Sequence, residues 1–126
     1  MSSPPPEPHA VLVVDDEPLL RLVASEALKD VGCTTYEAGA AGEALEVLSA
    51  HPDISLLFTD INMPGDQDGM ELAETVHRQR PDVQLIITSG RERPAPRDIP
   101  DDGRFIAKPY DIDTLAAIVQ AIPRRT

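Results

Sequence analysis

Short apolar runs alternate along this chain with segments whose apolar residues recur every three or four positions. Runs of strand length lie at 11–14, 54–58, 83–88 and 104–107, and 34–38 is a further short strand candidate. The run at 54–58 is apolar except for Ser55, which is typical of a central strand covered on both faces. The intervening stripes indicate amphipathic helices. This alternation favours βαβ units and predicts an α/β fold built on a parallel sheet.

The predicted helices carry start and stop signals, except in one segment. Pro18 suits the first turn of the first helix, Gly32 suits its end, and Asp111 can cap the last helix. The segment 91–100, where a fourth helix belongs in this rhythm, contains three prolines. A proline inside a helix costs about 3 kcal/mol, so we expect mostly loop there, with one helical turn at most.

The length of 126 residues fits a single domain. Residues 1–9 contain four prolines and no apolar stretch, so we expect a flexible tail there, followed by the folded domain at 10–122 and a short tail at 123–126. Cys33 is the only cysteine, which excludes an internal disulfide, and we expect it to be a small buried side chain. His9, His51 and His77 lie in the tail or near helix ends, and we expect all three to be solvated.

The charge balance narrows the classes of partner. The formal net charge is −11, from 22 acidic and 11 basic side chains, which disfavours direct binding to nucleic acid or to an anionic membrane. The first residues do not form a signal peptide, and no apolar run approaches the roughly 20 residues of a membrane span. A soluble cytoplasmic protein is therefore expected.

Polar side chains follow the predicted strands where each strand ends. Asp15 and Asp16 follow the first strand, Asp60 ends the third, Ser89 the fourth and Lys108 the fifth. Ligands of parallel sheets bind outside the carboxyl ends of the strands, so these side chains are expected to converge. Grouped carboxylates repel one another, and a hard cation such as Mg²⁺ relieves that repulsion. With a lysine and a hydroxyl beside them, they are the parts needed to form and hold an aspartyl phosphate.

Five short motifs make the resemblance to a known family specific. They are Val13-Val14-Asp15-Asp16-Glu17, Asp60-Ile61-Asn62-Met63-Pro64, Asp68-Gly69, Ser89-Gly90 and Lys108-Pro109. In order and approximate spacing they resemble the receiver domain of two-component response regulators, over about residues 10–122. The resemblance implies a flavodoxin-like sheet of order 2-1-3-4-5 with helices on both faces, the fourth helix being short or replaced by a loop. It also implies a switch that takes a phosphoryl group from a sensor histidine kinase or phosphotransfer protein and then changes its contacts with a downstream protein. From the length we expect a stand-alone receiver, with a missing output domain as the open alternative.

The resemblance assigns a role to each site residue. Asp60 is the implied phosphoacceptor, and the peptide between Lys108 and Pro109 is implied to be cis. The implied Mg²⁺ ligands are Asp16, Asp15 (directly or through water), Asp60 and the backbone carbonyl of Asn62. Lys108 is the implied charge partner of the phosphoryl group, Ser89 the switch hydroxyl and Phe105 the aromatic switch residue, although a Phe on an edge strand is as often plain core.

Three features depart from the family pattern. The loop between Pro64 and Gly69 is one residue longer than usual. Thr88 competes with Ser89 as the switch hydroxyl, and Ser89 is favoured because Gly90 follows it. The interval from Ser89 to Lys108 is short and proline-rich, so we expect the region 91–105 to be an extended loop that serves a heterologous partner, with basic residues at Arg91, Arg93, Arg97 and Arg104.

Other functions remain open on the sequence. A degenerate receiver could act only as a docking module. A dehalogenase-like phosphatase also forms an aspartyl phosphate, but it needs a second Asp two residues after the nucleophile, where this chain has Asn62. A flavin-binding module of the same fold class would need a phosphate-cradling loop after the first strand, and Asp15-Asp16-Glu17 would repel the phosphate.

Overall fold

The structure, a computed structural model, describes residues 8–63, 68–90, 94–95 and 98–124. Residues 1–7 of the predicted tail, and Arg91, Arg93 and Arg97 of the predicted basic loop, lie outside the described residues. The elements in chain order are β1 (Ala10–Val14), α1 (Pro18–Asp30), β2 (Thr34–Ala38), α2 (Ala41–Ala50), β3 (Leu56–Asp60), α3 (Gly69–Gln79), β4 (Gln84–Ser89), the 3₁₀ turn η2 (Pro100–Asp102), β5 (Arg104–Ala107) and α4 (Ile112–Ala121).

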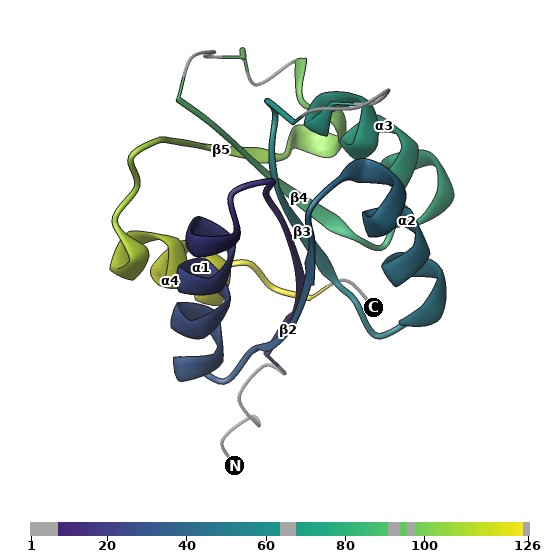
Figure 1. Cartoon of the computed structure of the whole chain (residues 1–126). Coiled ribbons are helices and arrows are strands. Elements are labelled where there is room, and N and C mark those ends of the chain that lie inside the picture. Colours follow the sequence, from purple (N-terminus) through teal and green to yellow (C-terminus); the bar gives the residue numbers. More distant parts are fainter. Residues whose placement is uncertain (1–7, 64–67, 91–93, 96–97, 125–126) are drawn as a thin grey trace.

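The strands form one parallel sheet of order β2-β1-β3-β4-β5, which confirms the predicted order (Figure 1). Val14 pairs with Thr59 across β1 and β3, and Asp60 pairs with Thr88 across β3 and β4. Because the strands are parallel and in register, the residues that follow them meet at one edge of the sheet. This edge holds the candidate site.

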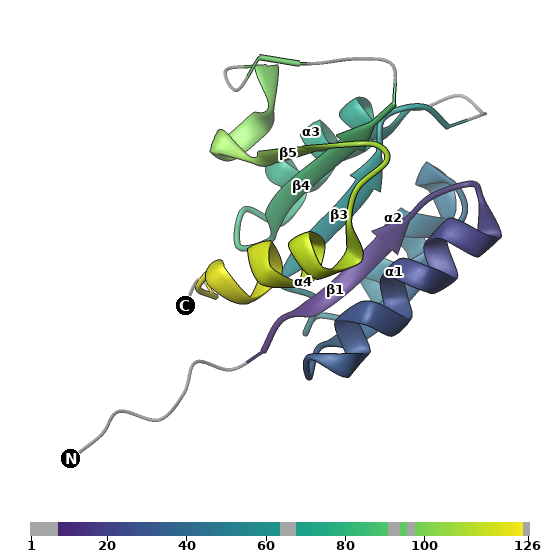
Figure 2. The ribbon, with the colours of Figure 1, turned by 90° about the vertical axis from the view of Figure 1, so that its left-hand side faces the viewer.

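Helices cover both faces of the sheet. The α1 and α4 helices lie over one face and α2 and α3 over the other (Figure 1), and Figure 2 looks onto the α1–α4 side. Successive residues of β1 serve opposite faces: Val11 and Val13 pack with Leu115 of α4, whereas Leu12 and Val14 pack with residues of α2 and α3. Burial on both faces explains why the central strands are continuously apolar. None of the helices in the part of the chain described here is long and apolar enough to span a membrane.

The connection between β4 and β5 holds no α-helix within its described residues. It contains the turn η2, which contacts α3, and the preceding Ile99 is buried in the α2–α3 core. Gly103 then lets the chain pass close to the sheet, since a Cβ atom there would collide with the side chain of Ile99. Within the described residues the structure agrees with the loop that the prolines predict, and Ile99 fills a position in the core beside α2 and α3.

The expectation that the three histidines are solvated is wrong. His9 is only 4% exposed and lies between β3 and the end of α4, with its Nδ1 atom 2.7 Å from Ser55 Oγ and its Nε2 atom 2.6 Å from the carbonyl oxygen of Ile122. His51 is half-buried and its ring lies 4.2 Å from that of Tyr36, and His77 is also half-buried. Cys33 is buried, as predicted.

Candidate functional site

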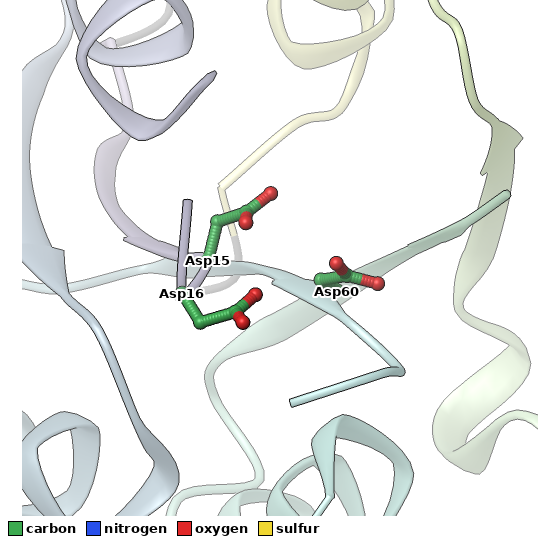
Figure 3. Close-up of side chains that lie close together, drawn as sticks. All are labelled: Asp15, Asp16 and Asp60. Atoms are coloured by element: carbon green, nitrogen blue, oxygen red, sulfur yellow. The ribbon is translucent and has the colours of Figure 1, made fainter. Parts of the chain in front are cut away.

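Three carboxylates meet at the carboxyl ends of β1 and β3. Asp15 and Asp16 follow β1, Asp60 is the last residue of β3, and an oxygen of each lies within 4.8 Å of the others (Figure 3). Asp15 and Asp60 are each 4% exposed, whereas Asp16 is exposed to solvent. Two of the four strand ends that the sequence singled out, those of β1 and β3, therefore do converge.

Backbone groups hold the two buried carboxylates in place. The backbone N–H of Glu17 donates to Asp15 Oδ1 at 2.9 Å, and the backbone N–H of Asn62 donates to Asp60 Oδ1 at 3.1 Å. Arg21, which the sequence analysis did not single out, donates from Nη1 to the backbone carbonyl of Asp15 at 2.8 Å. Its Nε atom also donates to Glu37 at 3.2 Å, so this arginine ties the loop after β1 to β2.

Gly69 is required where α3 begins beside the site. Its backbone N–H donates to the carbonyl oxygen of Ile61 at 2.9 Å, and a Cβ atom at this position would collide with the backbone of Asp60 and Ile61. Asp68 caps the helix by accepting a hydrogen bond from the backbone N–H of Glu71 at 2.9 Å. The Asp-Gly pair of the sequence motif thus allows α3 to start against the residue that carries the central carboxylate.

Lys108 bridges the buried carboxylates from the end of β5. Its Nζ atom donates to Asp60 Oδ2 at 2.7 Å and to Asp15 Oδ2 at 3.2 Å, and its side chain is 16% exposed. Burial alone would lower the pKa of Lys108, but the hydrogen bond to Asp60 and the charges of Asp15 and Asp60 outweigh burial and raise it. The peptide between Lys108 and Pro109 is cis, as the resemblance implied.

Ser89 lies beside this group at the end of β4. It is fully buried, and its Oγ atom accepts a hydrogen bond from Nδ2 of Asn62 at 3.1 Å. The hydroxyl of Thr88 is also buried, and among the described residues it has no hydrogen-bond partner. Phe105 pairs in register with Ile87 and is half-buried against the α2–α3 core, so it does not line the cleft. The sequence assigned Asn62 only a backbone role and gave no signal for its side-chain bond to Ser89.

A cleft of about 500 Å³ opens over these residues. Its described lining is mostly polar and comes from the loops after β1, β3, β4 and β5: Asp16, Glu17, Asp60, Ile61, Asn62, Met63, Asp68, Gly90 and Lys108. Its position outside the strand ends is where parallel sheets bind ligands, and its size suits a small anion together with a cation.

The donor set fits a divalent cation. One lysine ammonium faces three carboxylates, so the group keeps a negative charge of about two when all of them are ionised. All side-chain donors of the cluster are oxygen atoms, which Mg²⁺ prefers over nitrogen or sulfur. Asp15, Asp16 and Asp60 could therefore hold Mg²⁺ at the mouth of the cleft.

Comparisons with known proteins identify the family of this chain. The sequence model described as the response regulator receiver domain matches residues 11–120 of this chain. The chain belongs to this family. Among curated proteins, this receiver domain is 39% identical over 116 residues to the DNA-binding transcriptional regulator NtrC of Escherichia coli K12. The match covers 87% of this chain but 24% of that regulator, so this receiver spans about a quarter of the length of such a relative.

Solved receiver structures share the fold. The receiver domain of NtrX from Brucella abortus superposes with a TM-score of 0.77 at 30% identity, covering 87% of this chain and 94% of that one. The response regulator TrrA of Thermotoga maritima, solved in complex with Mg²⁺ and BeF, superposes with a TM-score of 0.75 at 27% identity, covering 89% of this chain and 96% of that one. These likenesses establish the receiver fold over nearly the whole described chain.

Proposed function

We propose that this receiver domain accepts a phosphoryl group on Asp60 from the phosphohistidine of a sensor histidine kinase or phosphotransfer protein, in a Mg²⁺-dependent reaction. One observation carries the proposal: the Asp60 carboxylate ends the central strand, lines the cleft, lies beside Asp15 and Asp16, and is paired with Lys108. A carboxylate nucleophile needs positive charge close by for attack on a phosphoryl group, and Asp60 makes the shorter of the two Lys108 ion pairs, at 2.7 Å against 3.2 Å for Asp15.

The transfer balances without any further reactant. A carboxylate oxygen of Asp60 attacks phosphorus as the bond from phosphorus to the histidine nitrogen breaks, and an acyl phosphate forms on Asp60. The electron pair of the broken bond stays on the imidazole, which takes up a proton from solvent. Held by Asp15, Asp16, Asp60 and the backbone carbonyl of Asn62, Mg²⁺ would supply positive charge that offsets the crowded oxygens. Lys108, already within 2.7 Å of Asp60, provides a second positive charge for a phosphoryl oxygen.

The signal then leaves through Ser89 and Phe105. In this proposal the Ser89 hydroxyl moves toward the phosphoryl group and the ring of Phe105 reorients with it. The neighbouring connection supports an output surface made of loop, because its described residues between β4 and β5 include no α-helix. A loop shifts its population at lower cost than a packed helix, which suits contact with a downstream protein of different structure.

Exposed apolar residues beside the cleft support docking of a helical phosphodonor. Leu19 is 73% exposed, Leu22 47%, and Val23 and Ile112 40% each. A groove of about 410 Å³ runs between α1 and α4 and shares Gly90 and Lys108 with the cleft. Val23 and Ile112 line this groove, and a donor that docks its apolar face here would bring its phosphohistidine next to Asp60.

The phosphatase alternative is disfavoured by Asn62. A phosphatase of the dehalogenase type requires an acid at this position, and the Asn62 side chain instead donates a hydrogen bond to Ser89. An amide does not exchange a proton with a leaving group at neutral pH, so this chain lacks a general acid there.

Intact-mass spectrometry tests the proposal. The wild type and Asp60→Asn are incubated with a small acyl phosphate and Mg²⁺, with a second series in a chelator. The wild type should gain one phosphoryl mass only with Mg²⁺, and Asp60→Asn should gain none because an amide is a poor nucleophile. Equal labelling of both proteins would remove Asp60 from its role, and no labelling of the wild type would favour the degenerate receiver.

A further inference from the structure

Asn62 makes contact with both functional groups that change during switching. Its backbone N–H donates to Asp60 Oδ1 at 3.1 Å, and its side-chain Nδ2 donates to Ser89 Oγ at 3.1 Å. We propose that the Asn62 side chain is a positioning residue that holds the Ser89 hydroxyl in its resting place and so sets how rarely the unphosphorylated domain adopts the switched state. This inference rests on the proposed function.

The backbone pairing of β3 and β4 brings Asn62 close to Ser89. The N–H of Ile61 donates to the carbonyl oxygen of Thr88 at 2.9 Å, which continues the pairing of β3 and β4 one residue past Asp60. By this register Ile61 lies level with Ser89, and Asn62 follows one residue later, from where its side chain reaches Ser89 Oγ. The N–H of Lys108 donates to the carbonyl oxygen of Ser89 at 3.0 Å, so the Ser89 backbone is held from β5 as well. With the backbone anchored on both sides, reorientation of Ser89 has to come mainly from its side chain.

The hydrogen bond opposes that reorientation. Ser89 is fully buried, so a hydroxyl that leaves the Asn62 amide loses this bond without water already in place to substitute for it. Asn62 itself is exposed, and solvent competition there puts the bond at the weaker end of the usual range. A bond of that strength disfavours the switched state roughly two- to fivefold.

The same residue is placed to respond to the acceptor. The backbone N–H of Asn62 donates to Asp60 Oδ1, whereas Lys108 donates to Oδ2. A phosphoryl group on Oδ1 therefore changes the hydrogen bond from Asn62, and one on Oδ2 changes the hydrogen bond from Lys108. A phosphoryl oxygen then offers Ser89 a charged acceptor, and a hydrogen bond to a charged partner is stronger than the neutral one it replaces. Asn62 thus restrains the resting domain but does not block switching.

Binding of beryllofluoride with Mg²⁺, a non-covalent mimic of the phosphoryl group, measures this restraint. A mimic that prefers the switched state binds more tightly in proportion to how often the free protein adopts it. The variants are Asn62→Ala and Asn62→Leu, where Leu keeps the volume but donates no hydrogen bond. Affinity is measured by calorimetry, and the amide resonances of Ser89 and Gly90 report the population in the free protein.

We expect Asn62→Ala and Asn62→Leu to bind beryllofluoride roughly two- to fivefold more tightly than the wild type, with the free resonances shifted toward their bound positions. In a Ser89→Ala background the same substitutions should change neither quantity, because the partner hydroxyl is gone. Thr88→Val, which removes the neighbouring hydroxyl at nearly constant volume, is the matched control and should behave as the wild type.

Unchanged or weaker binding by both Asn62 variants would overturn the inference, as would an equal effect in the Ser89→Ala background. Either result would leave the proposed function intact provided that the wild type binds the mimic. A wild type that binds Mg²⁺ but not beryllofluoride would instead overturn the proposed function, and this inference with it.

Discussion

The two ends of the sheet handle polar groups in opposite ways. At the carboxyl end two of three clustered carboxylates, Asp15 and Asp60, share the Lys108 ammonium, and the third, Asp16, remains exposed. At the other end a buried neutral network joins His9, Ser55 and Ile122. A carbonyl can only accept, so His9 Nε2 donates to Ile122 and Nδ1 accepts from the Ser55 hydroxyl, which in turn accepts from the N–H of Ala10 at 3.1 Å. The carboxyl end of the sheet keeps unbalanced charge for a ligand. The opposite end satisfies its polar groups internally, and its hydrogen bonds join the first and the last residues of the folded domain.

Removing the His9 network should lower the stability of the fold and leave Mg²⁺ binding unchanged. His9→Ala leaves Ser55 and the Ile122 carbonyl without their partner and opens a cavity, so we expect the free energy of unfolding to fall by about 2–4 kcal/mol. Urea denaturation measures the loss. Mg²⁺ affinity should not change, since His9 lies at the opposite end of β1 from the acidic cluster.

The matched control for this variant is His51→Ala. His51 is half-buried and contacts Tyr36 through its ring alone, so its removal should cost no more than about 1 kcal/mol. Equal losses in the two variants would mean that the His9 network contributes nothing beyond ordinary packing.

Removing a carboxylate from the acidic cluster should weaken Mg²⁺ binding without lowering stability. Asp16→Ala takes away an exposed carboxylate of the cluster, and we expect Mg²⁺ to bind about tenfold more weakly, a change of about 1.4 kcal/mol. Without Mg²⁺ the variant should be at least as stable as the wild type, because a repelling charge is gone. Calorimetric titration and urea denaturation give the two quantities. The same Mg²⁺ affinity in both proteins would show that Asp16 is not a ligand.

Acidification should lower the free energy of unfolding through the His9 network. Burial lowers the pKa of His9; the hydrogen bond to Ile122 raises it and the charge of Arg124 lowers it, and the net direction is down from 6.5. Below about pH 6.5 His9 is therefore protonated in the unfolded chain but still neutral in the folded domain. The His9 contribution to the free energy of unfolding is full above that pH and declines as the pH falls toward the lower pKa of His9 in the folded domain. The decline cannot exceed about 1.4 kcal/mol per pH unit for one group. Denaturation midpoints between pH 5 and pH 7.5 measure it, and His9→Gln should flatten that part of the profile.

The site residues could be predicted where they lie at the carboxyl end of a strand that the sequence itself marks. Asp15, Asp16, Asp60 and Lys108 each follow a recognisable strand, and parallel strands bring such positions together whatever the details of packing. The three prolines likewise predicted the connection before β5, since the proline ring is incompatible with a helix interior. These inferences needed only strand order and residue type.

The remaining contacts could not be predicted because they join segments that are distant in sequence. His9 and Ile122 are 113 positions apart, and no spacing in the sequence relates them. The bond between Asn62 and Ser89 depends on the exact register of β3 and β4, since a shift of one residue would turn the amide to another neighbour. The Arg21 bond to the Asp15 carbonyl depends on how α1 packs on the sheet.

The central claim is that Asp60, and no other carboxylate of the cluster, carries the phosphoryl group, and reductive trapping tests it most directly. The domain is treated with a small acyl phosphate and Mg²⁺ and then with borodeuteride, which reduces an acyl phosphate to an alcohol, releases phosphate and leaves deuterium at the modified residue. Peptide sequencing by mass spectrometry locates the deuterium. We predict a deuterated homoserine at position 60 that disappears when Mg²⁺ is chelated. Deuterium at position 15 or 16, or a phosphoryl mass gain without any label at position 60, would contradict this account.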